Sequence, residues 1–203
     1  GEAYYHMDMF AEAAGQYRKI LDNFSDSPVL EWAKLGLAYS EFELRNFREA
    51  RLAAKALLDA EDAPEKLKSY GELVTAHSLF NERQYEDAVY RYEQFARANP
   101  AMAEAGDALF YAGKAYYQLE YYANAIDAWK KVVTQYKNSE KAPEAAFLMG
   151  DTFFKAQKYD QAIAAYRMLS QWPEENNPRA GEVDLLVARA YYNAKMDDKA
   201  IAA

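Results

Sequence analysis

The stretch that decides the fold runs from Gly113 to Trp129 and reads GKAYYQLEYYANAIDAW. Tyr116 follows the small residue Gly113 by three positions, and Tyr122, Ala125 and Trp129 follow one another at spacings of three and four. Such spacings place side chains on one face of a helix. The stretch therefore predicts two helices joined by a short polar turn, which approach closely where Gly113 leaves space.

This pattern repeats along the whole chain. The position of Ala125 recurs at an almost constant interval, as Ala13, Ala50, Ala88, Ala125, Ala162 and Ala200. A fixed period of this length indicates an array of stacked supersecondary units. We call the helix with this alanine helix B and the preceding one helix A. The small position of helix A recurs as Gly1, Ala76, Gly113, Gly150 and Ala188.

The second repeat has a different internal spacing. We interpret Gly36 as its small residue. Gly36 lies two positions further from the alanine of its repeat, Ala50, than the small residue of any other repeat lies from its own alanine. This interpretation predicts a longer turn between Phe42 and Asn46. The expected repeats are 1–27, 28–64, 65–100, 101–142, 143–178 and 179–203, which together form a single array. Gly1 aligns with the middle of a helix A and Ala203 with a helix B. Because solenoids end on polar caps, we expect a segment of a longer array.

Composition favours helices and removes several classes of function. Hydrophobic residues make up 51% of the 203 residues, and glycine and proline are sparse. The chain has no cysteine, which removes disulfides and thiolate chemistry. Its net charge of −8, without a cluster of lysine and arginine, argues against nucleic-acid binding. No apolar run approaches the length of roughly 18 residues that a membrane-spanning helix needs.

The repeating pattern resembles the tetratricopeptide repeat. Gly113-Lys114-Ala115-Tyr116 with Tyr122, Ala125 and Trp129, and Gly150-Asp151-Thr152-Phe153 with Tyr159, Ala162 and Tyr166, match its small and aromatic positions. The period of this chain is slightly longer than is usual for the family. The resemblance implies an all-α, right-handed superhelical solenoid of helix-turn-helix repeats. It also implies that helix A lines the concave face.

The long period and the segments 131–136 and 140–146 resemble bacterial envelope members, of the Tol-Pal coordinator and outer-membrane assembly lipoprotein types. This implies a periplasmic or outer-membrane-associated protein, with the cytoplasm as the alternative. The function expected is a non-enzymatic scaffold that binds a protein or peptide, without inserting into the membrane. Two alternatives remain open: a polysaccharide-handling module of an export system, and a structural spacer that self-associates through its ends.

The register of helix A gives the residues of the expected groove, among them one aromatic residue four positions after the small residue in five of six units. The predicted partner-binding residues are Tyr5, His77, Phe80, Asn81, Phe110, Lys114, Tyr117, Phe147, Asp151, Phe154, Lys155, Arg189 and Tyr192. Such rings suit an apolar peptide or sugar rings, and they equally suit packing against the next repeat.

No residues are predicted to be catalytic, to bind a cofactor or to bind a metal. His6 and His77 lie about two repeats apart, too far to share a zinc ion, which wants three or four converging ligands. Asn81, one turn after His77, gives the nearest polar pair, and we interpret His77 as a groove residue with a satisfied hydrogen bond. Acidic pairs such as Glu174-Glu175 fall in expected turns and are interpreted as solvated.

Overall fold

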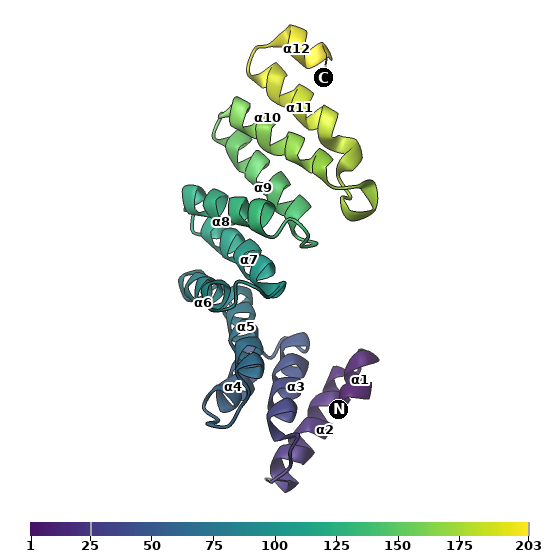
Figure 1. Ribbon diagram of the computed structural model, residues 1–203, viewed down its shortest axis with the longest axis vertical. Helices are drawn as coiled ribbons and strands as arrows, with labels where there is room; N and C mark the ends of the chain where they lie inside the picture. Colours follow the sequence, from purple (N-terminus) through teal and green to yellow (C-terminus); the bar gives the residue numbers. More distant parts are fainter. Residues whose placement is uncertain (25, 203) are drawn as a thin grey trace. The chain divides into compact units, whose positions relative to one another are not determined.

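The computed structural model describes residues 1–24 and 26–202, and within them the chain is helical with no strand (Figure 1). Ala203, the end of the last expected repeat, lies outside these residues. The α-helices are α1 (Glu2–His6), α2 (Phe10–Asn23), α3 (Leu30–Glu43), α4 (Phe47–Leu58), α5 (Glu65–Asn81), α6 (Tyr85–Ala98), α7 (Glu104–Gln118), α8 (Tyr122–Gln135), α9 (Ala142–Lys155), α10 (Tyr159–Met168), α11 (Val183–Asn193) and α12 (Asp197–Ala202).

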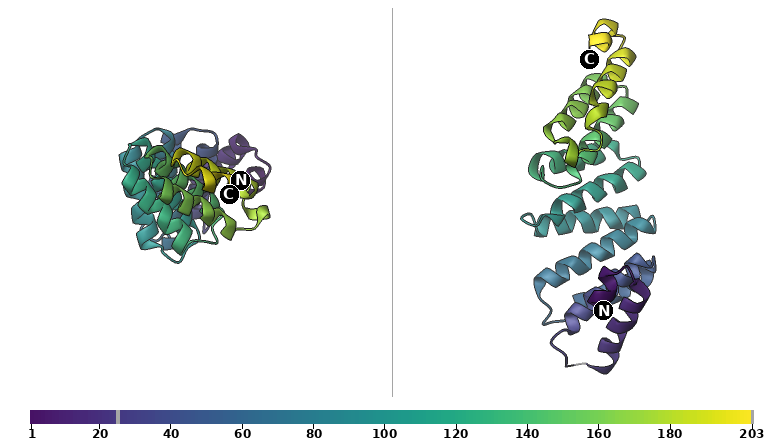
Figure 2. Two further views of the ribbon diagram at one scale, coloured as in Figure 1. Left: turned by 90° about the horizontal axis from the view of Figure 1, so that it is seen from above. Right: turned by 90° about the vertical axis from the view of Figure 1, so that its right-hand side faces the viewer.

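The helices fall into two compact units, Gly1–Asn99 with α1 to α6 and Pro100–Ala203 with α7 to α12. Within each unit an odd-numbered helix A and the next even-numbered helix B form a hairpin (Figure 2). Helix B also packs on the following helix A, as α2 does on α3 and α8 on α9. In addition α3 contacts α5 in the first unit and α7 contacts α9 in the second, so these A helices also pack on one another.

All six hairpins turn in the same way. The middle residue of each three-residue turn has a positive φ of 57° to 64°, and its N–H donates to the carbonyl three positions back. The next N–H donates five positions back, which completes a Schellman motif. Glycine normally occupies the positive-φ position, but here it is occupied by Asp8, Arg45, Arg83, Glu120, Gln157 and Lys195.

The small residue of helix A makes room for a large ring of helix B. A Cβ on Gly113 would lie 2.6 Å from Cδ1 of Trp129, whose indole N–H donates to the carbonyl of Phe110 at 3.2 Å. A Cβ on Gly150 would likewise lie 2.5 Å from Cε1 of Tyr166. Trp129 and Tyr166 are each 1% exposed, so the close approach of the two backbones is fixed by buried rings.

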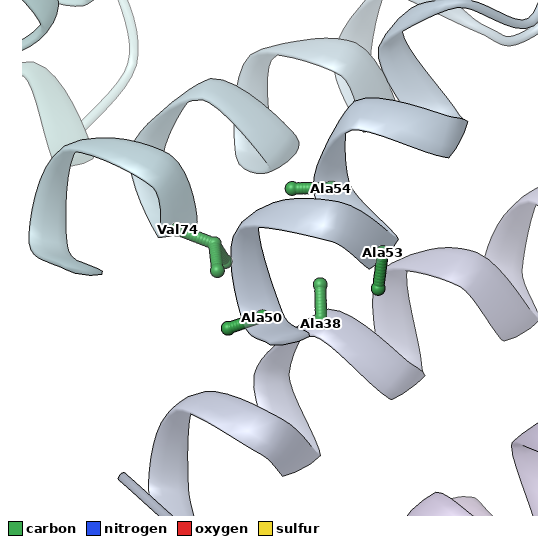
Figure 3. Packing of buried hydrophobic residues seen from close by; sticks show 5 residues of the cluster. All are labelled: Ala38, Ala50, Ala53, Ala54 and Val74. Atoms are coloured by element: carbon green, nitrogen blue, oxygen red, sulfur yellow. The ribbon is translucent and has the colours of Figure 1, made fainter. Parts of the chain in front are cut away.

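The second repeat is regular, and the expected longer turn is wrong. Its turn is as short as the others, and the small residue of α3 is Ala38, which has the same separation from Ala50 as Gly113 has from Ala125. Figure 3 shows Ala38 packed against α4, whose small side chains Ala50, Ala53 and Ala54 allow the helices to lie close. Gly36 serves another purpose: it leaves room for the ring of Tyr17 from the preceding repeat.

Alanine replaces the large helix-B ring in this repeat, and helix A compensates with a buried polar residue. Glu41 is 1% exposed and holds the position that an aromatic or leucine residue occupies in the other repeats. Its carboxylate accepts hydrogen bonds from the Arg18 guanidinium and, at 2.9 Å, from the side-chain amide of Asn46. A buried carboxylate needs such partners, because removal from water disfavours its charge.

Candidate functional site

One aromatic residue stands four positions after the small residue in every repeat. With Ala38 as the small residue of the second repeat, this helix-A aromatic row consists of Tyr5, Phe42, Phe80, Tyr117, Phe154 and Tyr192. With Gly36 as the small residue, the same two groove positions would fall on Ser40 and Glu41, which are buried. The sequence contained the signal for Phe42, because the separation of Ala38 from Ala50 matches the spacing found in the other repeats.

The rings of the row close the hairpin turns. In each of the first five repeats the ring meets the first aromatic ring of helix B, with centroids 5.2 to 5.6 Å apart. These five rings are half-buried, whereas Tyr192 in the sixth repeat is 70% exposed. Four of these pairs are edge-to-face and the pair of Phe42 is tilted, and such pairs add stability beyond the area that they bury. The row therefore has a structural role and still presents aromatic surface.

The row also touches the next repeat within each unit, at the residue that directly follows the next small position. The ring of Phe42 lies 6.0 Å from that of His77, and the guanidinium of Arg189 lies 4.4 Å from the centroid of Phe154. Tyr5 and Tyr39 form the corresponding edge-to-face pair at 6.5 Å. Packing against the neighbouring repeat, one of the two roles considered for these rings, is thus real.

His77 has its polar contacts within the repeat. Its Nδ1 shares a hydrogen bond of 2.7 Å with the Tyr92 hydroxyl, and the Asn81 side chain donates to its main-chain carbonyl at 2.8 Å. Burial lowers the pKa of His77 to about 4, because the imidazolium would lose its water. His77 is therefore neutral near pH 7. The expected satisfied histidine is present, and its ring fills space between Phe42 and Tyr92.

Cations cover the groove rings of the second unit. The Lys155 ammonium donates to the Tyr117 hydroxyl at 2.9 Å and pairs with Asp151 at 2.9 Å, and both bonds raise the pKa of the Lys155 ammonium. The Arg179 guanidinium lies 3.8 Å from the centroid of Phe147. Cations stacked on rings in this way gain electrostatic energy from the ring faces.

The prediction that Phe110 belongs to the groove is wrong. Its side chain is 1% exposed, so it belongs to the core and cannot touch a partner. Its carbonyl instead orients the Trp129 indole, and the Lys114 ammonium lies 5.5 Å from its ring centroid. Phe110 lies three residues before Gly113, on the side of helix A that faces the helix-B ring.

The first unit contains an aromatic pocket that the sequence did not predict. Its cavity of about 640 Å³ is lined by α1, α2, α3 and α5 through the rings of Tyr5, Tyr17, Trp32, Tyr39 and Tyr70. Tyr5 alone of these was predicted as a groove residue. Tyr39 was missed through the register of Gly36, whereas Trp32 and Tyr70 each lie six residues before the small residue of their helix A, a position from which no groove residue was predicted.

Two other kinds of site are absent from residues 1–24 and 26–202. Three or more histidine, cysteine or acidic side chains do not come together there in a way that could hold a metal ion. Over the same residues, each helix is too short or too polar to cross a bilayer.

Family models match three parts of the chain. Two are described as tetratricopeptide repeats and match residues 1–27 and 147–203. Another, described as subunit 3 of the anaphase-promoting complex, or cyclosome, matches residues 81–169. Among curated proteins, none matches the chain significantly.

Several solved structures share the fold at low sequence identity. The C-terminal part of a TPR repeat-containing protein from Cytophaga hutchinsonii is 17% identical, with a TM-score of 0.76 over 97% of this chain and 70% of that one. PilF of Pseudomonas aeruginosa is 19% identical, with a TM-score of 0.72 over 100% of this chain and 84% of its own. MamA is 16% identical, with a TM-score of 0.67 over 87% and 88% of the two chains.

Proposed function

Because the chain belongs to the tetratricopeptide repeat superfamily, we propose that it is a non-enzymatic scaffold that holds a segment of a partner protein against its A helices. Arrays of this kind act through the surfaces that their stacked helices expose. Within a unit, the partner would lie along the members of the helix-A aromatic row and the neighbouring charged residues. As the resemblance of segments 131–136 and 140–146 suggests, we place this scaffold in a complex of the bacterial cell envelope.

One observation carries the proposal: every repeat presents an aromatic ring at the same place on helix A, although the hairpins need these rings only in part. The first five members of the row are half-buried, so part of each ring stays exposed beside its hairpin. Partly exposed rings bury a large area on binding at a small cost in side-chain entropy. Within each unit, rings that recur in successive repeats suit an extended polypeptide better than a compact ligand.

A crosslinking experiment tests the face as well as the function. A photoreactive phenylalanine analogue is placed at Tyr192, and in separate proteins at Tyr121 or Tyr90, which are 55% and 62% exposed on or beside B helices. After irradiation in extracts of the native source, we expect one polypeptide to be joined to position 192 and absent from the two control positions. Equal labelling at all three positions would contradict a helix-A binding face.

The same experiment separates the alternatives. A polysaccharide-handling module would give a carbohydrate adduct at position 192, and a self-associating array would give an adduct of two copies of this chain. Fractionation of the native cells tests the compartment independently. Recovery of the chain in the cytoplasmic fraction would remove the envelope proposal without affecting the scaffold.

A further inference from the structure

We propose that the A helices of the second unit bind an acidic side chain of the partner polypeptide through Lys155 and Arg189, and that Asp151 is the internal counter-ion which this side chain displaces. The inference rests on the proposed scaffold function and specifies one contact within it. It follows from a buried hydroxyl without a partner, that of Tyr166, and from the charges around it.

The Tyr166 hydroxyl is buried and has no hydrogen-bond partner among the residues that the structure describes. The side chain is 1% exposed, and its ring crosses α9 at Gly150, where a Cβ would lie 2.5 Å from Cε1. In the third repeat the corresponding hydroxyl, of Tyr92, shares a hydrogen bond with His77, the residue directly after the small position. The residue at that position in the fifth repeat is Asp151, whose carboxylate is a strong acceptor.

Asp151 is paired with Lys155 instead, one turn later on α9. The carboxylate and the ammonium lie 2.9 Å apart, and the same ammonium donates to the Tyr117 hydroxyl at 2.9 Å. Burial, and next the charge of Asp151, raise the pKa of Tyr166 to about 12, so this hydroxyl is a donor at pH 7 with the carboxylate nearby. Asp151 thus has two competing partners. Because a buried hydroxyl without a partner is costly, leaving Lys155 for Tyr166 offsets much of the lost ion pair.

Two cations mark the place that the partner's carboxylate would take. The Arg189 guanidinium stacks on Phe154, 4.4 Å from the ring centroid, and forms no hydrogen bond or ion pair within the described chain. The charges of Arg189 and Lys155 oppose that of Asp151 in their effect on the pKa of Tyr166, so both cations lie near this hydroxyl. With one carboxylate between them, the two cations leave a net positive charge, and a guanidinium suits a second carboxylate in particular.

The site lies inside the array and is open to a ligand. Asp151, Lys155 and Tyr166 belong to the fifth repeat, where α8 of the fourth repeat packs on α9, and α10 packs on α11 of the sixth. The side chain of Lys155 is 60% exposed and that of Asp151 is 26% exposed. A segment that follows the aromatic row from Tyr117 to Phe154 therefore passes the ion pair.

The first test asks whether the chain selects an acidic residue. A display library of short random peptides is selected on the complete chain and on its Lys155→Gln, Arg189→Gln variant. We expect aspartate or glutamate to be enriched at one fixed position on wild type and not on the variant. The matched control, Lys130→Gln with Lys131→Gln, removes the same charge at exposed positions of α8 and should keep the enrichment. Enrichment that is lost in this control, or absent on wild type, would overturn the proposal.

The second test measures the counter-ion. The best selected peptide is synthesised with glutamate or with glutamine at the enriched position, and titration calorimetry gives both affinities. The glutamate peptide should bind wild type about 5- to 30-fold more tightly. Asp151→Asn should raise its affinity by roughly 2- to 5-fold, because Lys155 is then free of its internal partner. Equal binding of the two peptides would exclude the site, and weaker binding to Asp151→Asn would mean that Asp151 contacts the partner itself.

Tyr166→Phe tests the alternative partner of Asp151. It should weaken the glutamate peptide by roughly 2- to 5-fold, since the displaced carboxylate finds no donor. In the Asp151→Asn background the same substitution should leave the affinity unchanged, and effects that simply add would contradict the exchange of partners. Without peptide, Tyr166→Phe should keep its urea midpoint. A marked loss of stability would show that the hydroxyl is already satisfied, which also overturns the proposal.

Failure here is distinguishable from failure of the scaffold function. If the protein crosslinked at position 192 binds the Lys155→Gln, Arg189→Gln chain as tightly as wild type, the scaffold proposal stands and the acidic-residue site is wrong.

Discussion

Gly113→Ala should destabilise the second unit, although alanine is the better helix former. The added methyl would lie 2.6 Å from Trp129 Cδ1 and closer still to Nε1, the donor to the Phe110 carbonyl. Overpacking of this kind costs about 1 to 3 kcal/mol, and a lost hydrogen bond costs about 1 kcal/mol more. The gain in helix propensity is about 1 kcal/mol, so we expect a net loss of about 1 to 3 kcal/mol.

Urea unfolding, followed by circular dichroism, measures this loss, and hydrogen exchange of the α7 and α8 amides locates it. Exchange is needed because repeat arrays can unfold in parts. Gly181→Ala is the control in the same unit, since a Cβ there has no atom within 4 Å. It should leave stability unchanged or raise it by up to about 1 kcal/mol. A Gly113→Ala chain as stable as this control would refute the argument.

A second substitution tests the cause. The third repeat pairs Ala76 with Tyr92 at the positions of Gly113 and Trp129, and both side chains are fully buried there. Adding Trp129→Tyr to Gly113→Ala should therefore recover part of the lost stability. An additive double variant would show that the methyl group and the indole do not compete for space.

Three further predictions concern a buried histidine, a hairpin turn and an ion pair between repeats. Burial lowers the pKa of His77 to about 4, so the unfolded chain binds the extra proton first, and stability should fall as the pH is lowered from about 6.5 to 4. The urea midpoints of wild type and His77→Gln should therefore converge over this pH range. A constant difference between the two midpoints would contradict the prediction. Glu120→Gly should be more stable than Glu120→Ala by about 1 kcal/mol, since both remove a charge and glycine alone accepts the φ of 62° without strain; equal melting temperatures would exclude backbone strain. Arg18→Met should lower the free energy of unfolding by about 3 kcal/mol, because it leaves the Glu41 carboxylate buried with one fewer partner. Adding Glu41→Leu to this variant should restore the urea midpoint. If the midpoint is not restored, Arg18 acts through packing alone.

The period of the alanines was sufficient to predict the helices, because each repeat buries the same face against its neighbours. Ala125 and Ala162 lie where helix B meets helix A, and both are fully buried. The alternation of A and B helices follows from this spacing and from the polar turns. The all-α repeat fold could therefore be predicted from local pattern alone.

The second repeat shows where local pattern misleads. Glycine fills the small position in three of the other repeats, so Gly36 was chosen over Ala38. The space beside Gly36 is used by Tyr17 of the preceding repeat, and only the folded chain brings the two together. The left-handed turn residues were equally invisible, because a positive φ without glycine leaves no compositional signal.

The candidate site divides in the same way. The aromatic row could be predicted, since its rings recur with the repeat period. The aromatic pocket could not, because it combines residues of four helices. The cations that stack on Phe147 and Phe154 likewise come from distant parts of the sequence, Arg179 and Arg189.

The two groove positions of helix A carry different kinds of information. The fourth residue after the small position is aromatic in every repeat, and its contact with helix B explains this uniformity without a partner. The residue directly after the small position follows no such rule: it is Glu2, Tyr39, His77, Lys114, Asp151 and Arg189 in successive repeats. Because this position changes in charge and size while the ring beside it stays, it has the freedom to set specificity. Exchanging this residue between repeats should therefore change the preferred partner sequence more than it changes stability.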